Sequence, residues 1–62
     1  LGRRLREANA RAAQELVLLT GWTHARVNAE LNRRAGIKRV TQATVEQLER
    51  RLHHAESWIR KL

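Results

Sequence analysis

The positively charged side chains between residues 22 and 43 are the part of this sequence best suited to a chemical task. They comprise five cations against the single acid Glu30, a net charge of +4, whereas residues 1–21 carry +2 and residues 44–62 carry +1. Guanidinium and ammonium groups are the usual protein partners of phosphate. We therefore expect a polyanion partner, nucleic acid first, although a basic and merely solvated surface is the alternative. The expected contact residues are Arg26, Arg33, Arg34, Lys38, Arg39, Thr41 and Gln42.

The other side chains that could take part in catalysis or bind a metal do not form a recognisable site. His53 and His54 are neighbours in a helical pattern and would point about 100° apart, so both cannot face one ion. The chain has no Cys or Asp, and Ser57, its only serine, has no activating pair nearby. A glycine-rich phosphate loop is also missing from the sequence. We expect no catalytic residue, cofactor site or metal site in this chain, which is not predicted to be an enzyme.

Length and composition indicate one small helical domain. The chain has 62 residues, a net charge of +7 and a sequence pI near 11.8. Proline is absent and glycine occurs only at positions 2, 21 and 36, which favours an all-α fold. The lack of cysteine suggests a cytoplasmic origin, and no run approaches the roughly 20 apolar residues of a membrane span. Because the first residue is Leu1, we expect a fragment of a longer protein.

The strongest local signals surround a short central helix. Thr23 has the position and type of an N-cap, and Gly36 has those of the glycine that ends a helix in left-handed backbone. Gly21 would end the preceding helix in the same way. These signals predict a helix over residues 23–35. The five residues after it should form a basic turn with Ile37 anchored inward and Lys38 and Arg39 in water.

Two longer helices are predicted on either side. Apolar residues at helical spacing predict one over residues 3–20. Residues 41 to 61 or 44 to 61 should form the other, with Thr41 or Thr44 as its cap. We expect the two long helices to lie antiparallel in a three-helix bundle. The stripe of apolar residues on the later helix is expected to pack into the core of this bundle rather than to form a coiled-coil seam. The stripes comprise Leu1, Leu5, Ala8, Ala12, Leu16 and Leu19, then Val45, Leu48, Leu52, Ala55, Ile59 and Leu62. The expected core is Leu5, Leu16, Leu19, Trp22, Val27, Leu31, Ile37, Val45, Leu48, Leu52 and Ile59.

Trp22 and Trp58 are the only aromatic residues. Trp22 precedes the cap of the central helix, where it would pack onto the core. Trp58 flanks the apolar stripe, so packing is favoured, although base stacking by its ring is an alternative.

Helix, glycine turn and second helix are similar in order to a helix-turn-helix, whose later helix enters the major groove of DNA. With Gly36 as the turn glycine, a usual apolar position would fall on Gln42. The chain is then either a variant with a lengthened turn or a three-helix bundle with a different docking face. The contact end offers charge more than base-reading groups, which predicts binding mainly to phosphates. The alternative is a protein-interaction or dimerisation module, although a monomer is expected.

The segment from residue 18 to 52 carries a family resemblance. It begins Leu-Leu-Thr-Gly-Trp-Thr-His-Ala-Arg-Val-Asn-Ala-Glu-Leu-Asn-Arg-Arg-Ala-Gly-Ile and ends Thr-Val-Glu-Gln-Leu-Glu-Arg-Arg-Leu. This resembles the C-terminal tail of some bacterial superfamily II (DEAD/DEAH-box-type) helicases. The resemblance covers over half of the chain but none of a helicase motor, and no DEAD-type motif is present. It implies an accessory domain that helps an ATP-dependent helicase, the parent protein, hold DNA or RNA, with DNA favoured.

Overall fold

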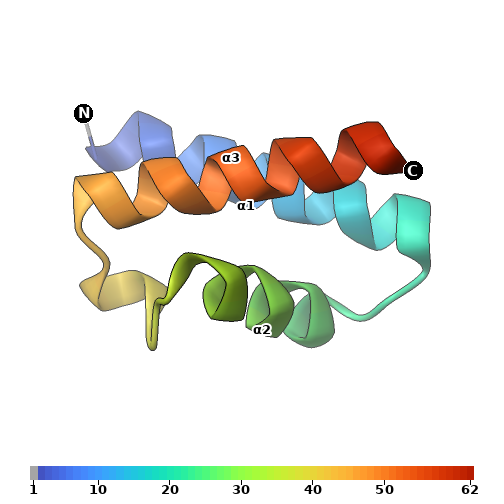
Figure 1. Cartoon of the computed structure of the whole chain (residues 1–62), viewed down its shortest axis with the longest axis horizontal. Helices are drawn as coiled ribbons and strands as arrows, with labels where there is room; N and C mark the ends of the chain where they lie inside the picture. The colour runs from blue at the N-terminus through green and yellow to red at the C-terminus, as the bar shows by residue number, and fades with distance from the viewer. Residues whose placement is uncertain (1) are drawn as a thin grey trace.

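The chain folds into an all-α bundle. A computed structural model describes residues 2–62, and Leu1 lies outside the described part. Helix α1 spans Gly2–Thr20, α2 spans His24–Ala35 and α3 spans Val45–Lys61, with a 3-10 turn, η1, at Val40–Gln42 (Figure 1). The predicted helices therefore exist, with boundaries within about one residue of those expected. Of the two predicted starts for the last helix, Thr44 is its cap, while Thr41 lies in the separate 3-10 turn.

The predicted caps explain where the helices begin and end. The Thr23 hydroxyl accepts a hydrogen bond from the backbone N–H of Arg26, and Thr44 and Gln47 form a reciprocal capping box. Gly36 has φ 69°, and the Ile37 N–H donates to the Asn32 carbonyl at 2.8 Å, as in a Schellman closure. Gly21 has φ 75° and ends α1. A side chain at either glycine would be strained in this left-handed conformation.

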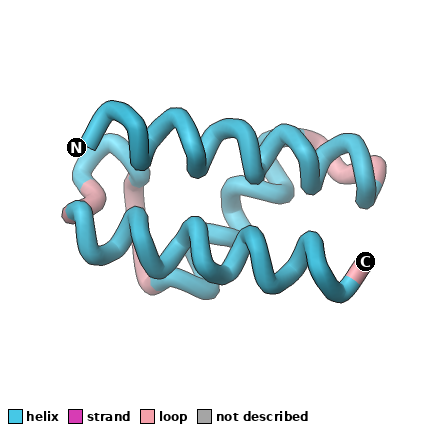
Figure 2. The backbone as a smooth tube through the Cα atoms, turned by 90° about the horizontal axis from the view of Figure 1, so that it is seen from above, coloured by secondary structure: helices cyan, strands magenta, loops and turns pink. Residues whose placement is uncertain are grey.

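The two long helices are parallel to each other, so the predicted antiparallel pairing was wrong. Figure 1 shows α1 and α3 running side by side in the same direction, with α2 running back along both, and Figure 2 shows the same arrangement from above. The chain reverses once at residues 21–23 and again at residues 36–44. Two reversals restore the original direction, and short connections place each helix beside its neighbour. The start of α1, η1 and the start of α3 consequently share one end of the bundle.

The core contains five of the eleven predicted residues, and its centre on α3 differs from the predicted stripe. Leu48 and Ala55 are fully buried, together with Leu16, Val27 and Leu31 from the other helices. Val45 and Leu62, at the ends of the predicted stripe, are 49% and 63% exposed. The centre of the buried face runs instead through Leu48, Arg51 and Ala55. Because α3 packs against both α1 and α2, its buried face lies between two neighbours, and both ends of the helix extend beyond the shorter α2.

Helix α1 shows the same shift. Its buried residues are Asn9, Ala12, Ala13 and Leu16, whereas Leu19 is exposed and was wrongly placed in the core. Leu5, Trp22, Leu52 and Ile59 are half-buried at the edge of the core, and Ile37 is buried as predicted. Leu1, the first member of the predicted stripe, is outside the described residues. The true centre of the α1 face is thus occupied in part by an asparagine.

None of the helices within residues 2–62 combines the length and the apolar character that crossing a membrane requires.

Candidate nucleic-acid interface

The connection between α2 and α3 presents the basic turn, residues 36–42. Lys38, Arg39, Thr41 and Gln42 are all exposed, as the sequence predicted. Lys38, Arg39 and Gln42 surround a shallow hollow of about 310 Å³ whose other walls are Gly36, Ile37 and Gln47. Buried Ile37 and half-buried Val40 attach the turn to the bundle on either side of the two cations. The backbone at this turn is therefore held, while the charged side chains face solvent.

Arg33 and Arg34, in the last turn of α2, are only partly available. Both bind Glu30: the Arg33 guanidinium donates two hydrogen bonds to the carboxylate, at 2.6 and 3.1 Å, and Arg34 Nε donates one at 2.8 Å. Arg34 also lies over the Trp58 ring, 4.5 Å from its centroid. Both arginines are exposed, but these contacts leave them less free to bind a phosphate than Lys38 and Arg39. The pair and Glu30 together contribute a net charge of +1 beside the basic turn.

The Glu30 contacts should make part of the domain's stability depend on pH. Hydrogen bonds from Arg33 and Arg34 lower the pKa of the Glu30 carboxyl from 4.5 to about 2. A carboxyl whose pKa is lower in the folded state than in the unfolded state stabilises the fold at pH values above the unfolded-state pKa. This contribution is lost as the pH falls through the folded-state pKa. We expect Glu30→Gln to lower the melting temperature near neutral pH and to reduce the fall in melting temperature between about pH 5 and pH 2.

The control for this experiment is Glu15→Gln, because Glu15 is exposed on α1 and makes no ion pair within the described residues. Circular dichroism melts of parent and both variants across the acid range supply the comparison. Equal acid sensitivity in the parent and the Glu30 variant would show that the Arg33–Glu30–Arg34 contacts add nothing to stability.

Arg26 lies apart from the other predicted site residues. It is in the first turn of α2, at the opposite end of that helix from the basic turn (Figure 1). Its guanidinium stacks on the Trp22 ring at 3.7 Å from the centroid, a cation–π contact. Arg26 is therefore not part of the surface formed by Lys38 and Arg39.

The two tryptophans pack against each other and against the core. Their rings meet edge to face, with centroids 5.3 Å apart and an interplanar angle of 69°. Both are half-buried against the core cluster, and each ring is stacked by a guanidinium, from Arg26 on Trp22 and from Arg34 on Trp58. This arrangement favours the packing role for Trp58 over base stacking.

A buried arginine network is the main feature that the sequence analysis missed. Arg51 of α3 is 2% exposed, and its guanidinium donates to the side-chain oxygens of three asparagines. Nε donates to Asn32 at 2.9 Å, Nη1 to Asn9 at 3.0 Å and Nη2 to Asn28 at 2.6 Å. The Asn9 amide donates in turn to the Leu5 and Leu48 carbonyls. The Arg51 network thus connects all three helices, and burial lowers the pKa of the Arg51 guanidinium.

Helical spacing contained a usable signal for this network. Arg51 lies three residues after Leu48 and four before Ala55, on the same helical face as both. Asn28 and Asn32 lie three residues before Leu31 and Ala35, which are both buried on α2, and therefore on the same side of that helix. The predicted core included only apolar residues, so it left out these polar positions.

Comparison with known proteins returned no matching family model, curated protein or solved structure.

Proposed function

We propose that this chain is a non-catalytic nucleic-acid-binding accessory domain that contacts mainly phosphates through its basic turn. The observation that carries the proposal is the pair Lys38 and Arg39, exposed beside a hollow and outside any ion pair in the described residues. Cations without an internal counter-ion are free to neutralise phosphate and release its counterions. Thr41 and Gln42 add neutral hydrogen-bonding groups to the same turn.

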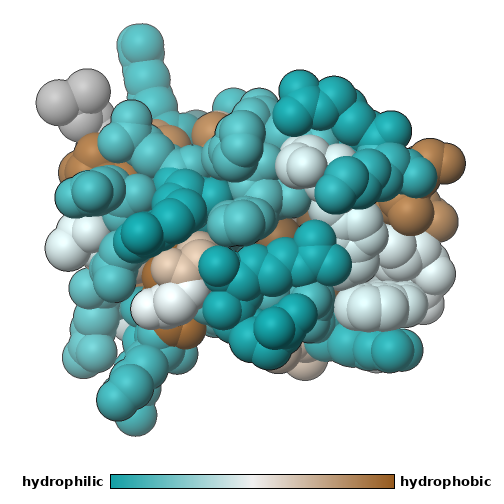
Figure 3. Space-filling view, in the orientation of Figure 1, coloured by the Kyte–Doolittle hydropathy of each residue, from teal (hydrophilic) through white to brown (hydrophobic). Residues whose placement is uncertain are grey.

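The first turns of α1 extend this basic surface. Arg6 is exposed on α1, whose start shares the η1 end of the bundle (Figures 1 and 2). Arg6 and Val40 line a second hollow, separate from the one at Lys38 and Arg39, which places α1 next to the turn. Figure 3 shows long hydrophilic side chains projecting at this end of the molecule. Several phosphates of one strand could be contacted from two segments of the chain, which supports binding without base recognition.

The resemblance to the tails of bacterial DEAD/DEAH-box-type helicases gives this binding a context. On that basis we propose a cytoplasmic parent helicase whose motor is assisted by this domain in holding DNA rather than RNA. The connection of residues 36–44 is longer than the three or four residues of a DNA-reading helix-turn-helix, which favours backbone contact over insertion of α3 in the major groove.

Charge reversal at the turn tests the proposal. We expect Lys38→Glu combined with Arg39→Glu to weaken oligonucleotide binding by roughly tenfold or more at low salt, and to flatten the salt dependence of the affinity. Fluorescence anisotropy with labelled single- and double-stranded DNA and RNA, at about 50 and 200 mM salt, measures both effects. Arg33 and Arg34 are left unchanged because their contacts with Glu30 and Trp58 also support the fold.

The matched control is Arg60→Glu combined with Lys61→Glu. These residues end α3, at the opposite end of the bundle from the turn, and the double variant makes the same change in net charge (Figure 1). Equal losses in the two double variants would show that only net charge matters, and an unaffected turn variant would remove the basic turn as the contact surface.

A protein-interaction module is the second candidate, supported by apolar residues at that opposite end. Leu18 is 78% exposed, and Leu19 and Leu62 are also exposed, where α1 and α3 both finish. Figure 3 shows a hydrophobic area at this edge. Association through it should persist at high salt because apolar burial is weakly screened. Sedimentation analysis across salt concentrations distinguishes the candidates, since a monomer throughout rules out self-association.

A further inference from the structure

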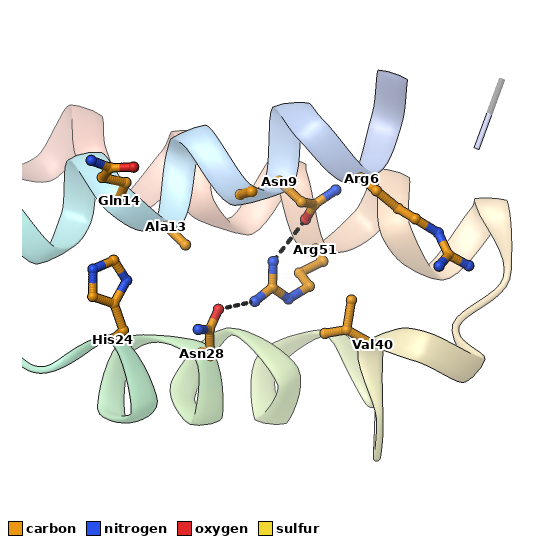
Figure 4. A pocket seen from close by; sticks show the side chains of 9 residues that line it. Arg6, Asn9, Ala13, Gln14, His24, Asn28, Val40 and Arg51 are labelled. Carbon is orange, nitrogen blue, oxygen red and sulfur yellow. Dashed lines mark hydrogen bonds between the residues drawn. The ribbon is translucent and has the colours of Figure 1, made fainter. Parts of the chain in front are cut away.

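A groove between α1 and α2 lies directly over Arg51. It has a volume of about 480 Å³, within the range of small-molecule sites. Helix α1 supplies one wall and α2 the other, while Val40 closes the η1 end and Arg51 of α3 forms the floor. Figure 4 shows the Arg51 guanidinium between Asn9 and Asn28, with His24 and Gln14 farther along the groove and Arg6 beyond Val40. We call this the Arg51 groove.

Its charge is positive and uncompensated. The lining contains Arg6 and Arg51 but no carboxylate. Arg51 is bonded only to neutral amide oxygens, and those three bonds use three of the five N–H donors that a guanidinium has. A buried charge without an opposite charge is unfavourable, and amide dipoles compensate it only in part. An anion in the groove would supply the missing opposite charge, and its attraction to the buried guanidinium is screened less than that between two exposed charges.

The remaining lining restricts the kind of anion. Ala10, Ala13 and Val40 offer apolar wall, while Gln14, His24 and Asn28 offer groups that can hydrogen bond. This combination of an apolar lining with a few convergent polar groups is typical of sites for small organic molecules. Guanidinium groups match the planar and tetrahedral oxygens of carboxylates and phosphates.

We propose that the Arg51 groove binds a small organic oxyanion, a carboxylate or phosphate monoester attached to an apolar body. The oxyanion lies toward Arg51 and Asn28, and the apolar body lies along Ala10 and Ala13. Binding there couples the ligand to all three helices, because the Arg51 network joins them. The groove shares Arg6 with the proposed nucleic-acid surface but no residue with the hollow at Lys38 and Arg39. The proposed site therefore does not rest on nucleic-acid binding by the basic turn.

Phenyl phosphate and benzoate are the probes, titrated at constant ionic strength into the isotope-labelled domain and followed by NMR. We expect saturable shifts of the Arg51 Nε–H and of the Asn9 and Asn28 side-chain amides for at least one probe. Asn28→Asp places a carboxylate against Arg51 Nη2 and should weaken binding about tenfold or more, the value of a charge-assisted hydrogen bond. Ala29→Asp, the same charge change at the exposed neighbouring position of α2, should leave affinity within about twofold of the parent.

Ala10→Leu provides a second variant that leaves the Arg51 network intact. Ala10 is exposed and lines the groove, so leucine should fill the space for the apolar body and weaken binding of the same probe. The Lys38→Glu and Arg39→Glu variant should bind it with little change. Non-saturating shifts spread over the surface arginines, or equal affinity in the parent, Asn28→Asp and Ala10→Leu proteins, would overturn the site and leave Arg51 a structural residue.

Discussion

Arg51→Ala is expected to unfold a large part of the domain population at room temperature. The substitution removes a side chain in contact with three asparagines and leaves the buried Asn9 oxygen without its donor. An unsatisfied buried acceptor costs ~1–3 kcal/mol, and the space left by the side chain adds a cavity term. Removing the buried charge offsets part of this cost, so we expect the free energy of unfolding to fall by roughly 3 kcal/mol. A domain of this size has only a few kcal/mol of stability in total.

Urea denaturation followed by tryptophan fluorescence measures the effect, because Trp22 and Trp58 lie against the core. Arg50→Ala is the control: the residue type is the same and the position adjacent, but Arg50 is exposed. The Arg50→Ala substitution should change the free energy of unfolding by no more than about 0.5 kcal/mol. Arg51→Met, which retains much of the side-chain volume, should fall between the two. Similar midpoints for the Arg50→Ala and Arg51→Ala variants would contradict the structural role of the network.

Leu31→Ala should have an effect of comparable size for a purely apolar reason. Leu31 is fully buried on α2 within the cluster that includes Leu16, Val27 and Ala55. Truncating a buried leucine costs ~2–5 kcal/mol, and the higher values apply where the surroundings cannot close around the cavity. The alanines at positions 12, 13 and 55 in the same cluster have no rotatable side chain that could refill the space. We expect a value in the upper half of that range.

The control for this cavity is Leu18→Ala, which makes the same chemical change at a side chain that is 78% exposed. Thermal melting followed by circular dichroism should show a large drop for Leu31→Ala and almost none for Leu18→Ala. An unchanged midpoint in the Leu31 variant would mean that α2 is not packed as the structure has it.

The two predictions together describe an unusual core for so small a domain. Within residues 2–62, its buried aliphatic residues are four alanines, three leucines, Val27 and Ile37, and the small alanine side chains allow the helices to approach closely. At the centre of the bundle, the Arg51 network then replaces further apolar side chains. A fully satisfied buried polar network can fix the register of its helices, since any slip would leave the guanidinium or an asparagine oxygen without a partner.

The proposed nucleic-acid surface is smaller and better defined than residue types alone indicated. Of the seven predicted contact residues, Lys38, Arg39, Thr41 and Gln42 lie exposed in one turn. Arg33 and Arg34 flank it but share Glu30, and Arg26 stacks on Trp22 near the other end. Local sequence could predict this turn because Gly36 and Thr44 mark the ends of the connection between α2 and α3 that contains it. It could not predict the partners of the arginines, which depend on helix packing.

Short-range signals determined the secondary structure of this protein from its sequence. Thr23, Gly36 and the Thr44–Gln47 capping box act over a few residues, so their consequences appear in the local order of residue types. The same holds for Gly21, whose left-handed backbone ends α1. These residues gave correct predictions of where the helices lie.

Tertiary structure alone decided the partners and the burial of the polar residues. The parallel packing of α1 and α3 instead follows from two chain reversals, at the short connections that begin with Gly21 and Gly36. Arg50 and Arg51 are adjacent and identical in type, yet one is in water and the other is buried. Arg51 is buried because α3 turns it toward α1 and α2, where Asn9, Asn28 and Asn32 supply side-chain oxygens to its guanidinium. These asparagines are distant from Arg51 in the sequence.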